Sequence, residues 1–136
     1  MIVQGLPYVI HSEGSDATGK GTVRRETLAA FIAEARDWAV FRCQLEHAQR
    51  GALLHQVQVY LDQRIPFDPV FDYRDATKLY CTELIWRAGL EALQLDLCPR
   101  KTTRGPYTFL TIENLTHTPY YKEVSNRKGS LNDKNN

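Results

Sequence analysis

The feature that most constrains this chain is the segment Phe67–Leu93, FDPVFDYRDATKLYCTELIWRAGLEAL. An aspartate-rich, aromatic loop runs there directly into a helical pattern. After Cys81, apolar residues recur at helical spacing, which predicts a helix with this cysteine in its first turns. Asp75 and Thr77, just upstream, are candidate N-cap residues. The apolar positions that define the pattern are Leu84, Ile85, Ala88 and Ala92.

A thiol near a helix N-terminus lies close to unpaired backbone N–H groups and to the positive end of the helix dipole. Both favour the thiolate, which is the nucleophilic form of cysteine. Cysteine is also among the most frequently buried residue types, so a cysteine on an apolar helix face is compatible with a place in the core. Composition and spacing leave both interpretations of Cys81 open.

The residues around Cys81 resemble the nucleophile segment of the YiiX/YaeF-like families, which are permuted papain-fold amidases and peptidases of the NlpC/P60 superfamily. This resemblance runs from about Leu6 to about Tyr121. It implies an α+β fold of the permuted papain-like type, with an antiparallel sheet packed against helices, and it implies that Cys81 is the nucleophile. The family pattern F-D-x-x-F-D, followed by x-Y-C-[ST]-E-L, is matched at Phe67, Asp68, Phe71, Asp72, Leu79, Tyr80, Cys81, Thr82, Glu83 and Leu84.

In the resembled families a histidine in an S-H-x-G strand precedes the cysteine and acts as the base, and a polar third member follows in the next strand. The segment Tyr8–Ser12, YVIHS, resembles that second strand, so His11 takes the third-member position. The base would then lie upstream of Met1, because no S-H-x-G motif is present. The resemblance therefore implies a chain that lacks the N-terminal segment with the catalytic histidine, a relative without chemistry, or His11 serving as the base itself.

Five polar residues near these positions have further candidate roles. Glu13 lies two residues after His11, on the same face of a strand, and is the alternative third member. Tyr80 precedes the nucleophile and is a candidate support. Glu83 follows Cys81 by two positions and points away from it on a helix, so a structural pairing with an arginine is expected. Asp68, with its neighbour Asp72, is either a ligand for a cation or a solvated loop acid.

The remaining histidines and cysteines do not predict a metal centre or a cofactor. His47 and His55 share a helix face, but no carboxylate or cysteine completes a metal-binding set with the usual spacing. His117 lies far along the chain and is a weaker candidate partner for Cys81. The three cysteines form no C-x-x-C pair, which argues against a disulfide framework and a thiolate zinc site.

The glycine-rich segment 13–22, EGSDATGKGT, allows a second kind of site. Gly14, Gly19 and Lys20 satisfy G-x-x-x-x-G-K after an expected strand. Gly21 stands where a P-loop has the magnesium-binding Ser or Thr, and Thr22 comes one place too late. A P-loop kinase also needs further strand–helix units that this chain does not show. The segment is therefore either a solvated turn or a P-loop.

Strands are expected at Leu6–Ser12, Trp38–Cys43 and Tyr107–Thr111. Helices are expected at Thr22–Arg36, at Glu46–Leu61 and, short and irregular, at Ile112–Tyr121. Pro66 and Pro69 exclude helix from the loop Arg64–Arg74. Residues 1–123 form the expected domain, and 124–136, with almost no apolar residues, form an expected disordered tail.

The composition excludes several classes of partner. With 136 residues, 43% hydrophobic and 24% charged, the chain has the composition of one globular domain. Its net charge of +1 gives no reason to expect nucleic acid as a partner. No apolar run is long enough to span a bilayer, and no signal peptide is visible, so a cytoplasmic location is the default. A missing N-terminal segment would open the cell envelope as an alternative.

These observations predict a cysteine hydrolase of the amidase or peptidase kind, acting on an amide or ester carbonyl through an acyl-enzyme. The resemblance implies a peptide, a cell-wall fragment or a lipid-like acyl compound as substrate. A non-catalytic binding relative of the same fold is the first alternative, and a P-loop nucleotide-binding protein is the second. The predicted catalytic residues are Cys81 and His11, with Glu13 and Tyr80 as third member or support.

Overall fold

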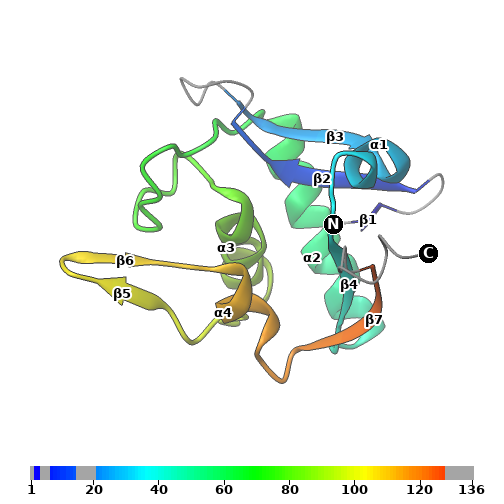
Figure 1. The fold of residues 1–136 in the computed structure, drawn as a ribbon. Helices are drawn as coiled ribbons and strands as arrows, with labels where there is room; N and C mark the ends of the chain where they lie inside the picture. The colour runs from blue at the N-terminus through cyan, green and yellow to red at the C-terminus, as the bar shows by residue number, and fades with distance from the viewer. Residues whose placement is uncertain (1, 4–6, 15–20, 128–136) are drawn as a thin grey trace, which may run out of the picture.

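The computed structural model describes residues 2–3, 7–14 and 21–127. The described part is a mixed α+β fold with small antiparallel sheets and helices (Figure 1), which is the predicted class. In chain order the elements are β1 (Ile2–Val3), β2 (Tyr8–Ser12), β3 (Val23–Thr27), α1 (Leu28–Ala33), β4 (Trp38–Cys43), α2 (His47–Asp62), α3 (Cys81–Leu93), β5 (Thr102–Arg104), β6 (Tyr107–Phe109), α4 (Ile112–Thr116) and β7 (Tyr121–Arg127).

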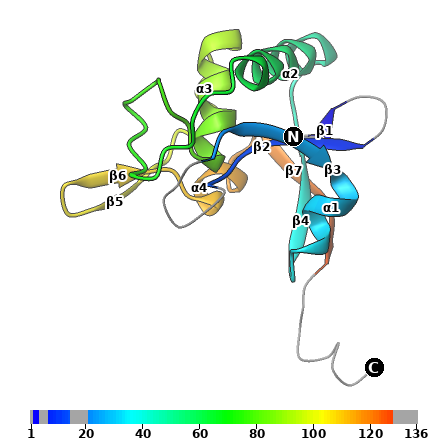
Figure 2. The same cartoon turned by 90° about the horizontal axis from the view of Figure 1, so that it is seen from above.

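The strands form three separate antiparallel groups. The first has the order β1-β2-β3, the second pairs β4 with β7, and the third is the hairpin β5–β6. Figures 1 and 2 show that the hairpin and the β4–β7 pair lie at opposite sides of the molecule, with α3 beside the hairpin. The loop that precedes α3 lies on the same side as the hairpin, so these two irregular segments approach each other around the start of α3.

The core forms where α2 and α3 pack against β2 and β3. Its central side chains are fully buried, and the hydroxyl of Tyr60 on α2 also donates a hydrogen bond of 2.6 Å to Glu91 on α3. A second, smaller cluster joins the outer face of α3 to the segment around α4. The buried residues of the first cluster are Ile10, Val23, Leu53, Val57, Tyr60, Leu79, Leu84, Ala88 and Leu97.

The junction between β2 and α3 positions the site. Leu79, two residues before the first helical residue, is completely buried. Its carbonyl oxygen accepts hydrogen bonds from the Ser12 hydroxyl at 2.6 Å and from the Asp68 amide at 3.2 Å. Its own amide donates to the carbonyl of Pro66 at 3.0 Å. The end of β2, the loop and the start of α3 are therefore fixed to one another.

The predicted helix Thr22–Arg36 is wrong over its first half. Val23–Thr27 form β3, paired in register with all five residues of β2, and only the six residues Leu28–Ala33 are helical. Val23 is buried on the sheet face that carries Ile10, so pairing with β2 buries it without a helix. Thr27 then caps the short helix by accepting a hydrogen bond of 3.1 Å from the amide of Ala30.

This correction also removes the structural context of a P-loop. The strand before the glycine-rich segment is followed by an antiparallel strand rather than by a helix. Gly19 and Lys20 lie outside the described residues. Gly21 has a different role, because a Cβ atom there would lie 1.7 Å from the carbonyl oxygen of Glu13. Only glycine allows the backbone to pass Glu13 this closely.

Three other boundaries differ from the sequence predictions. The N-cap of α3 is Tyr80 rather than Asp75 or Thr77, whose side chains bond each other within the loop. The expected tail begins too early, because β7 continues to Arg127 and pairs with β4, while 128–136 lie outside the described residues. The strand Thr102–Arg104 was not expected. The predicted strand Trp38–Cys43 is confirmed, and the second predicted helix is confirmed within one residue.

Among the described helices, none combines the length and the apolar character that crossing a bilayer requires.

Two helical glycines provide a matched test of the packing. A Cβ atom at Gly89 in α3 would lie 2.8 Å from the side chain of the buried Leu97, whereas one at Gly51 in α2 would meet nothing within 4 Å. Gly89→Ala is therefore expected to lower the free energy of unfolding by about 1–3 kcal/mol through overpacking. Gly51→Ala is expected to raise it by about 0.5–1 kcal/mol through helix propensity. Urea denaturation measures both, and equal effects of the two variants would contradict the packing.

Candidate active site

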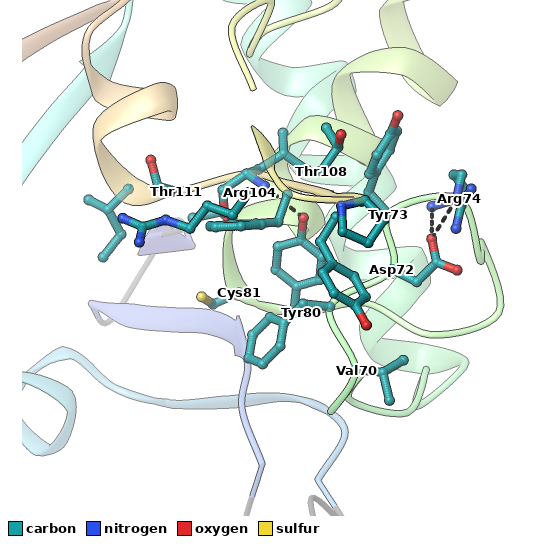
Figure 3. Close-up of a pocket in the computed structure, with 16 residues that line it drawn as sticks. Val70, Asp72, Tyr73, Arg74, Tyr80, Cys81, Arg104, Thr108 and Thr111 are labelled. Carbon is teal, nitrogen blue, oxygen red and sulfur yellow. Dashed lines mark hydrogen bonds and ion pairs between the residues drawn. The ribbon is translucent and has the colours of Figure 1, made fainter. Parts of the chain in front are cut away.

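Cys81 is the first residue of α3 and is the one exposed cysteine of the three; Cys43 is half-buried and Cys98 is buried. Figure 3 shows its sulfur at the side of a pocket over which Arg104 extends. The predicted position of this thiol in the first turn of a helix is confirmed. Its exposure excludes the alternative in which Cys81 is a core residue.

The pocket has a volume of about 840 Å³ and lies between the loop before α3, the start of α3 and the hairpin β5–β6. Four of its side chains, Val70, Phe71, Tyr107 and Ile112, are large, apolar and exposed. Arg104 is exposed and makes no ion pair within the described part of the chain. The residues that line the pocket are Val70, Phe71, Asp72, Tyr73, Arg74, Tyr80, Cys81, Thr82, Arg104, Pro106, Tyr107, Thr108, Phe109, Leu110, Thr111 and Ile112.

The loop wall of the pocket is built around Asp68. Its buried carboxylate accepts hydrogen bonds from the amides of Val70 at 2.9 Å and Asp72 at 2.7 Å. These bonds close a tight turn in which Phe71 has φ 56°, a left-handed conformation that is unfavourable for a bulky residue. The ring of Phe71 is thereby placed 5.2 Å from that of Tyr80. Asp68 is therefore a buried structural acid, and the interpretation of this residue as a solvated loop acid is wrong.

Tyr80 joins the two walls. Its ring is buried, and its hydroxyl accepts a hydrogen bond of 3.0 Å from the amide of Leu110, just after β6 (Figure 3). The adjacent Thr82 hydroxyl donates to the carbonyl of the same Leu110 at 2.8 Å. Loss of solvation raises the pKa of the Tyr80 phenol, so it stays protonated across the physiological range. The residues on either side of Cys81 thus hold the hairpin base against α3.

Glu83 is structural, as the sequence predicted. Its carboxylate is fully buried, accepts a hydrogen bond from the Tyr80 amide at 3.3 Å, and lies 3.4 Å from the guanidinium of Arg87. Arg87 also donates to the carbonyl of Tyr73, which connects α3 to the pocket loop. Burial raises the pKa of Glu83 to about 7, although Tyr80 and Arg87 both oppose that shift.

The pKa of the Cys81 thiol is raised, contrary to the expectation from its helix position. Loss of solvation is the largest cause, and the negative charge of Glu13 adds to it. The amides of Thr82 and Cys81 lower the pKa, as the helix N-terminus predicts, but they do not outweigh the loss of solvation. The thiol is therefore mostly protonated at neutral pH.

His11 lies on β2 within a group of charged side chains. Its Nδ1 is 3.3 Å from Oε2 of Glu13, and its Nε2 is 2.9 Å from Oε1 of Glu26. Arg24, opposite His11 on β3, approaches Glu13 at 3.4 Å. The ring of Phe31 on α1 stands edge-on to the imidazole at 5.0 Å. Burial lowers the pKa of His11, and both carboxylates oppose that effect.

The structure does not bring His11 into hydrogen-bond contact with Cys81 in the described part of the chain. Glu13 connects the two regions, because it contacts the His11 ring and its charge acts on the thiol. His47, His55 and His117 are exposed, and none of them contacts Cys81 among the described residues. Of the predicted site residues, Cys81 and Tyr80 therefore share the pocket, while His11 and Glu13 lie beside it.

Sequence reasoning missed two sets of residues at the site. Arg104 and Tyr107 carry no motif, and they reach the pocket only because an unexpected hairpin brings them there. Glu26 was placed in an expected helix, whereas in β3 it shares a face with His11. The segment Val23–Thr27, VRRET, has one apolar residue and no alternation, so its sequence carries no clear strand signal.

No known protein-family model matches this sequence, and no curated protein matches it in sequence. Among solved structures, the chain is similar to the one described as the crystal structure of metalloprotein yiiX from Escherichia coli O157:H7, DUF1105. The TM-score is 0.74 at 18% sequence identity, and the match covers 94% of this chain and 80% of that one. The chain therefore has a YiiX-like fold.

The raised pKa of Cys81 makes a prediction for alkylation by iodoacetamide. The rate at Cys81 should reach half its maximum at a pH above about 8.5, the ordinary thiol value. Glu13→Gln should move that midpoint to lower pH by removing a nearby negative charge. Peptide mass spectrometry gives the rate at each site, with the buried Cys98 as the slow internal control. A midpoint below pH 7 would show that the helix amides dominate.

Glu83 makes a prediction for stability against pH. Its pKa of about 7 in the folded protein lies above the unfolded value near 4.3, so the folded state binds the proton more tightly. Stability should therefore fall as pH rises through the window between these values. The loss should be a few kcal/mol, since each pKa unit is worth about 1.4 kcal/mol. Glu83→Gln should flatten this slope in urea denaturation at pH 4 to 8. If the dependence of the unfolding free energy on pH is the same in Glu83→Gln, a group other than Glu83 causes it.

Proposed function

We propose that this protein is a thiol hydrolase of the permuted papain-like type, in which Cys81 is the nucleophile and the substrate is an amide or ester with an apolar acyl part. The observation that carries this proposal is the position of Cys81: first residue of a helix, exposed, and open to a pocket of about 840 Å³. That arrangement combines a nucleophile, free helix amides and room for a substrate.

The chemistry follows the general scheme of covalent acyl transfer. The sulfur of Cys81 bonds to the carbonyl carbon of the substrate while the thiol proton passes to a base. The amides at the start of α3 support the negative charge that develops on the carbonyl oxygen. The carbon–nitrogen or carbon–oxygen bond then breaks, and the leaving amine or alcohol takes up the proton. Water attacks the resulting thioester and releases the acid and the free thiol.

His11 is the proposed base, with Glu13 as its third member. The raised pKa of Cys81 makes a base necessary, and the contact between Glu13 and the His11 ring supports a connected pair beside the thiol. A water molecule between His11 and the thiol carries the proton in this proposal, because the two do not contact each other directly. Tyr80 is a positioning residue that holds Leu110 against the start of α3.

The lining of the pocket supports a lipid-like acyl compound or an apolar peptide over a sugar-rich cell-wall fragment. Val70, Phe71, Tyr107 and Ile112 offer exposed apolar surface, which favours apolar substrate groups. Arg104, beside them, adds a positive charge that suits a carboxylate or phosphate on the same substrate.

A non-catalytic binding protein is the second candidate, and one specific observation favours it. Cys81 has a raised pKa and no histidine within hydrogen-bond distance in the described part of the chain. A pocket that binds an apolar ligand without cleaving it agrees with this geometry equally well. An acyl-enzyme on Cys81 forms only if the protein is a hydrolase, so its detection distinguishes the two candidate functions.

The yiiX structure is described as that of a metalloprotein, which raises the question whether this chain has residues that fit a metal ion. His11, Glu13 and Glu26 do, since their ligand atoms lie within 4.8 Å of one another and the buried Nε2 of His11 lacks a hydrogen bond. A metal ion bound there would supply a fixed positive charge beside Glu13. The nucleophilic step proposed for Cys81 does not depend on it.

The proposed function is tested with p-nitrophenyl esters of increasing acyl length. The wild-type protein should release p-nitrophenolate faster for longer chains and should carry one acyl group on Cys81, cleavable by hydroxylamine, in intact-mass spectra. Cys81→Ala should lose at least about 10²-fold in rate, which is the low end of what removal of a catalytic group costs.

Cys43→Ala is the matched control, because it removes a half-buried cysteine on β4 and should leave the rate unchanged. His11→Ala should lower the rate while Cys81 remains open to iodoacetamide. Wild-type and Cys81→Ala proteins that hydrolyse every ester equally would refute the hydrolase. If the esters then still protected Cys81 from alkylation, the binding protein would be favoured.

A further inference from the structure

The face of β2 and β3 that points away from the core carries a compact group of charged side chains. Along β2, His11 and Glu13 alternate with the buried Ile10 and Ser12. Along β3, Arg24 and Glu26 lie on the face opposite to the buried Val23. His11 is only 9% exposed, although it lies on this outer face, because Phe31 of α1 stands against its ring. The group is therefore partly enclosed rather than freely solvated.

The imidazole has a carboxylate oxygen near each of its two nitrogens. Glu13 is 3.3 Å from Nδ1, and Glu26 is 2.9 Å from Nε2. A neutral imidazole has one N–H donor and one lone pair, so one of the two carboxylates faces a lone pair and repels it. Two arrangements remove the repulsion: a proton on both nitrogens, or a metal ion in place of one proton.

The geometry at Nε2 favours the metal ion. The atom is buried and lies 2.9 Å from Oε1 of Glu26, yet it has no well-aligned hydrogen-bond partner among the described residues. A second proton there would leave a buried donor unsatisfied, which is costly. A metal ion on the nitrogen lone pair would satisfy this atom and would also neutralise the facing carboxylates.

We propose that His11, Glu13 and Glu26 form a binding site for a divalent first-row transition-metal ion, with zinc or manganese as the expected occupant. One ligand atom from each residue lies within 4.8 Å of the other two. Ligands about 2.1 Å from a shared ion lie roughly 3–4 Å apart, so small side-chain rotations complete the site. Glu13 and Glu26 are partly exposed and free to make them.

The donor set determines the class of metal ion. One imidazole nitrogen with two carboxylates suits zinc, manganese or iron(II), whereas magnesium prefers oxygen ligands alone and keeps its water molecules. Binding strength should therefore follow the general order in which zinc exceeds manganese, with magnesium weakest. Three protein ligands leave coordination positions open for water or a substrate group.

Arg24 is the internal competitor for this ion. Its guanidinium lies 3.4 Å from Oε2 of Glu13, and both side chains are about half exposed. The pair is weak for that reason, and an ion with two positive charges displaces it at modest cost. Arg24→Gln should strengthen metal binding severalfold, because the competing charge disappears and the ligands remain.

The site also bears on the proposed function, without depending on it. A metal ion uses a nitrogen of His11, which the proposed base needs free. Occupancy and hydrolysis should therefore oppose each other if both proposals hold. Metal binding itself needs no Cys81 chemistry, so it is measured in Cys81→Ala protein. Failure of the hydrolase then leaves this proposal standing, and failure of metal binding leaves the hydrolase standing.

The experiment is calorimetric titration of metal-free Cys81→Ala protein with Zn²⁺, Mn²⁺ and Mg²⁺, together with the visible spectrum of the Co²⁺-loaded protein. We expect one Zn²⁺ per chain with a dissociation constant below about 10 µM, which is about 7 kcal/mol of binding free energy. The Co²⁺ spectrum should show nitrogen and oxygen ligands without a sulfur charge-transfer band, in the wild-type protein as well.

Glu26→Gln is the decisive variant, because it keeps the shape of a partly exposed side chain and removes one charged ligand. It should weaken Zn²⁺ at least tenfold, and His11→Ala should abolish binding. His55→Ala, which removes an exposed histidine of α2, is the control and should have no effect. Circular dichroism confirms that each variant is folded.

The proposal is overturned if Zn²⁺ does not bind at 100 µM to the folded protein. It is also overturned if Glu26→Gln binds as tightly as its parent, or if the Co²⁺ spectrum of the wild-type protein shows a sulfur ligand in place of the nitrogen and oxygen set. In any of these cases the three residues are not a metal site and form an ion-pair network with Arg24.

Discussion

The carbonyl group of Leu79 is the point on which the described structure depends. It is buried, and it accepts hydrogen bonds from the end of β2 and from the loop before α3. A buried carbonyl without a hydrogen bond would cost a few kcal/mol in folding free energy. The need to satisfy this carbonyl therefore holds both segments in place. The start of α3 follows two residues later. The position of the thiol is thus fixed by backbone satisfaction rather than by any contact of the thiol itself.

The charges around the site oppose one another. The amides at the start of α3 stabilise a thiolate, while Glu13 and the loss of solvation stabilise the thiol. The same Glu13 contacts His11 and Arg24, so one carboxylate connects the Cys81 thiol to the polar face of β2 and β3. Whatever neutralises Glu13, whether a proton, Arg24 or a metal ion, therefore also changes the thiol. The pKa of the Cys81 thiol and the charges on this strand face are thus linked through Glu13.

The sequence predicted a helix with Cys81 in its first turns, the structural role of Glu83 and the mixed α+β class, because strong helical periodicity and local pairing rules determine all three. The helix predicted over Thr22–Arg36 is wrong in its first half. The apolar residues there match a helical face, but Val23 and Glu26 belong to a strand that pairs with β2. Sequence reasoning also missed the hairpin that brings Arg104 to the pocket. Strand pairing and the hairpin's position depend on contacts between distant segments, which the periodicity of a short segment does not reveal. The direction of the Cys81 pKa shift escapes the sequence for the same reason, because the loss of solvation that mainly raises it comes from segments distant in the chain, and Glu13 adds to it.

The hairpin β5–β6 is a two-stranded ribbon, and an isolated ribbon of this kind is only marginally stable. No other described helix or strand packs extensively against it. Its order comes from its base, where Tyr80 and Thr82 hold Leu110 and where Lys101 pairs with Asp96 at 3.4 Å. The hairpin wall of the pocket is therefore held in place at its base alone. Because the hairpin is held at its base, that base also sets the distance between the two walls of the pocket beside Cys81.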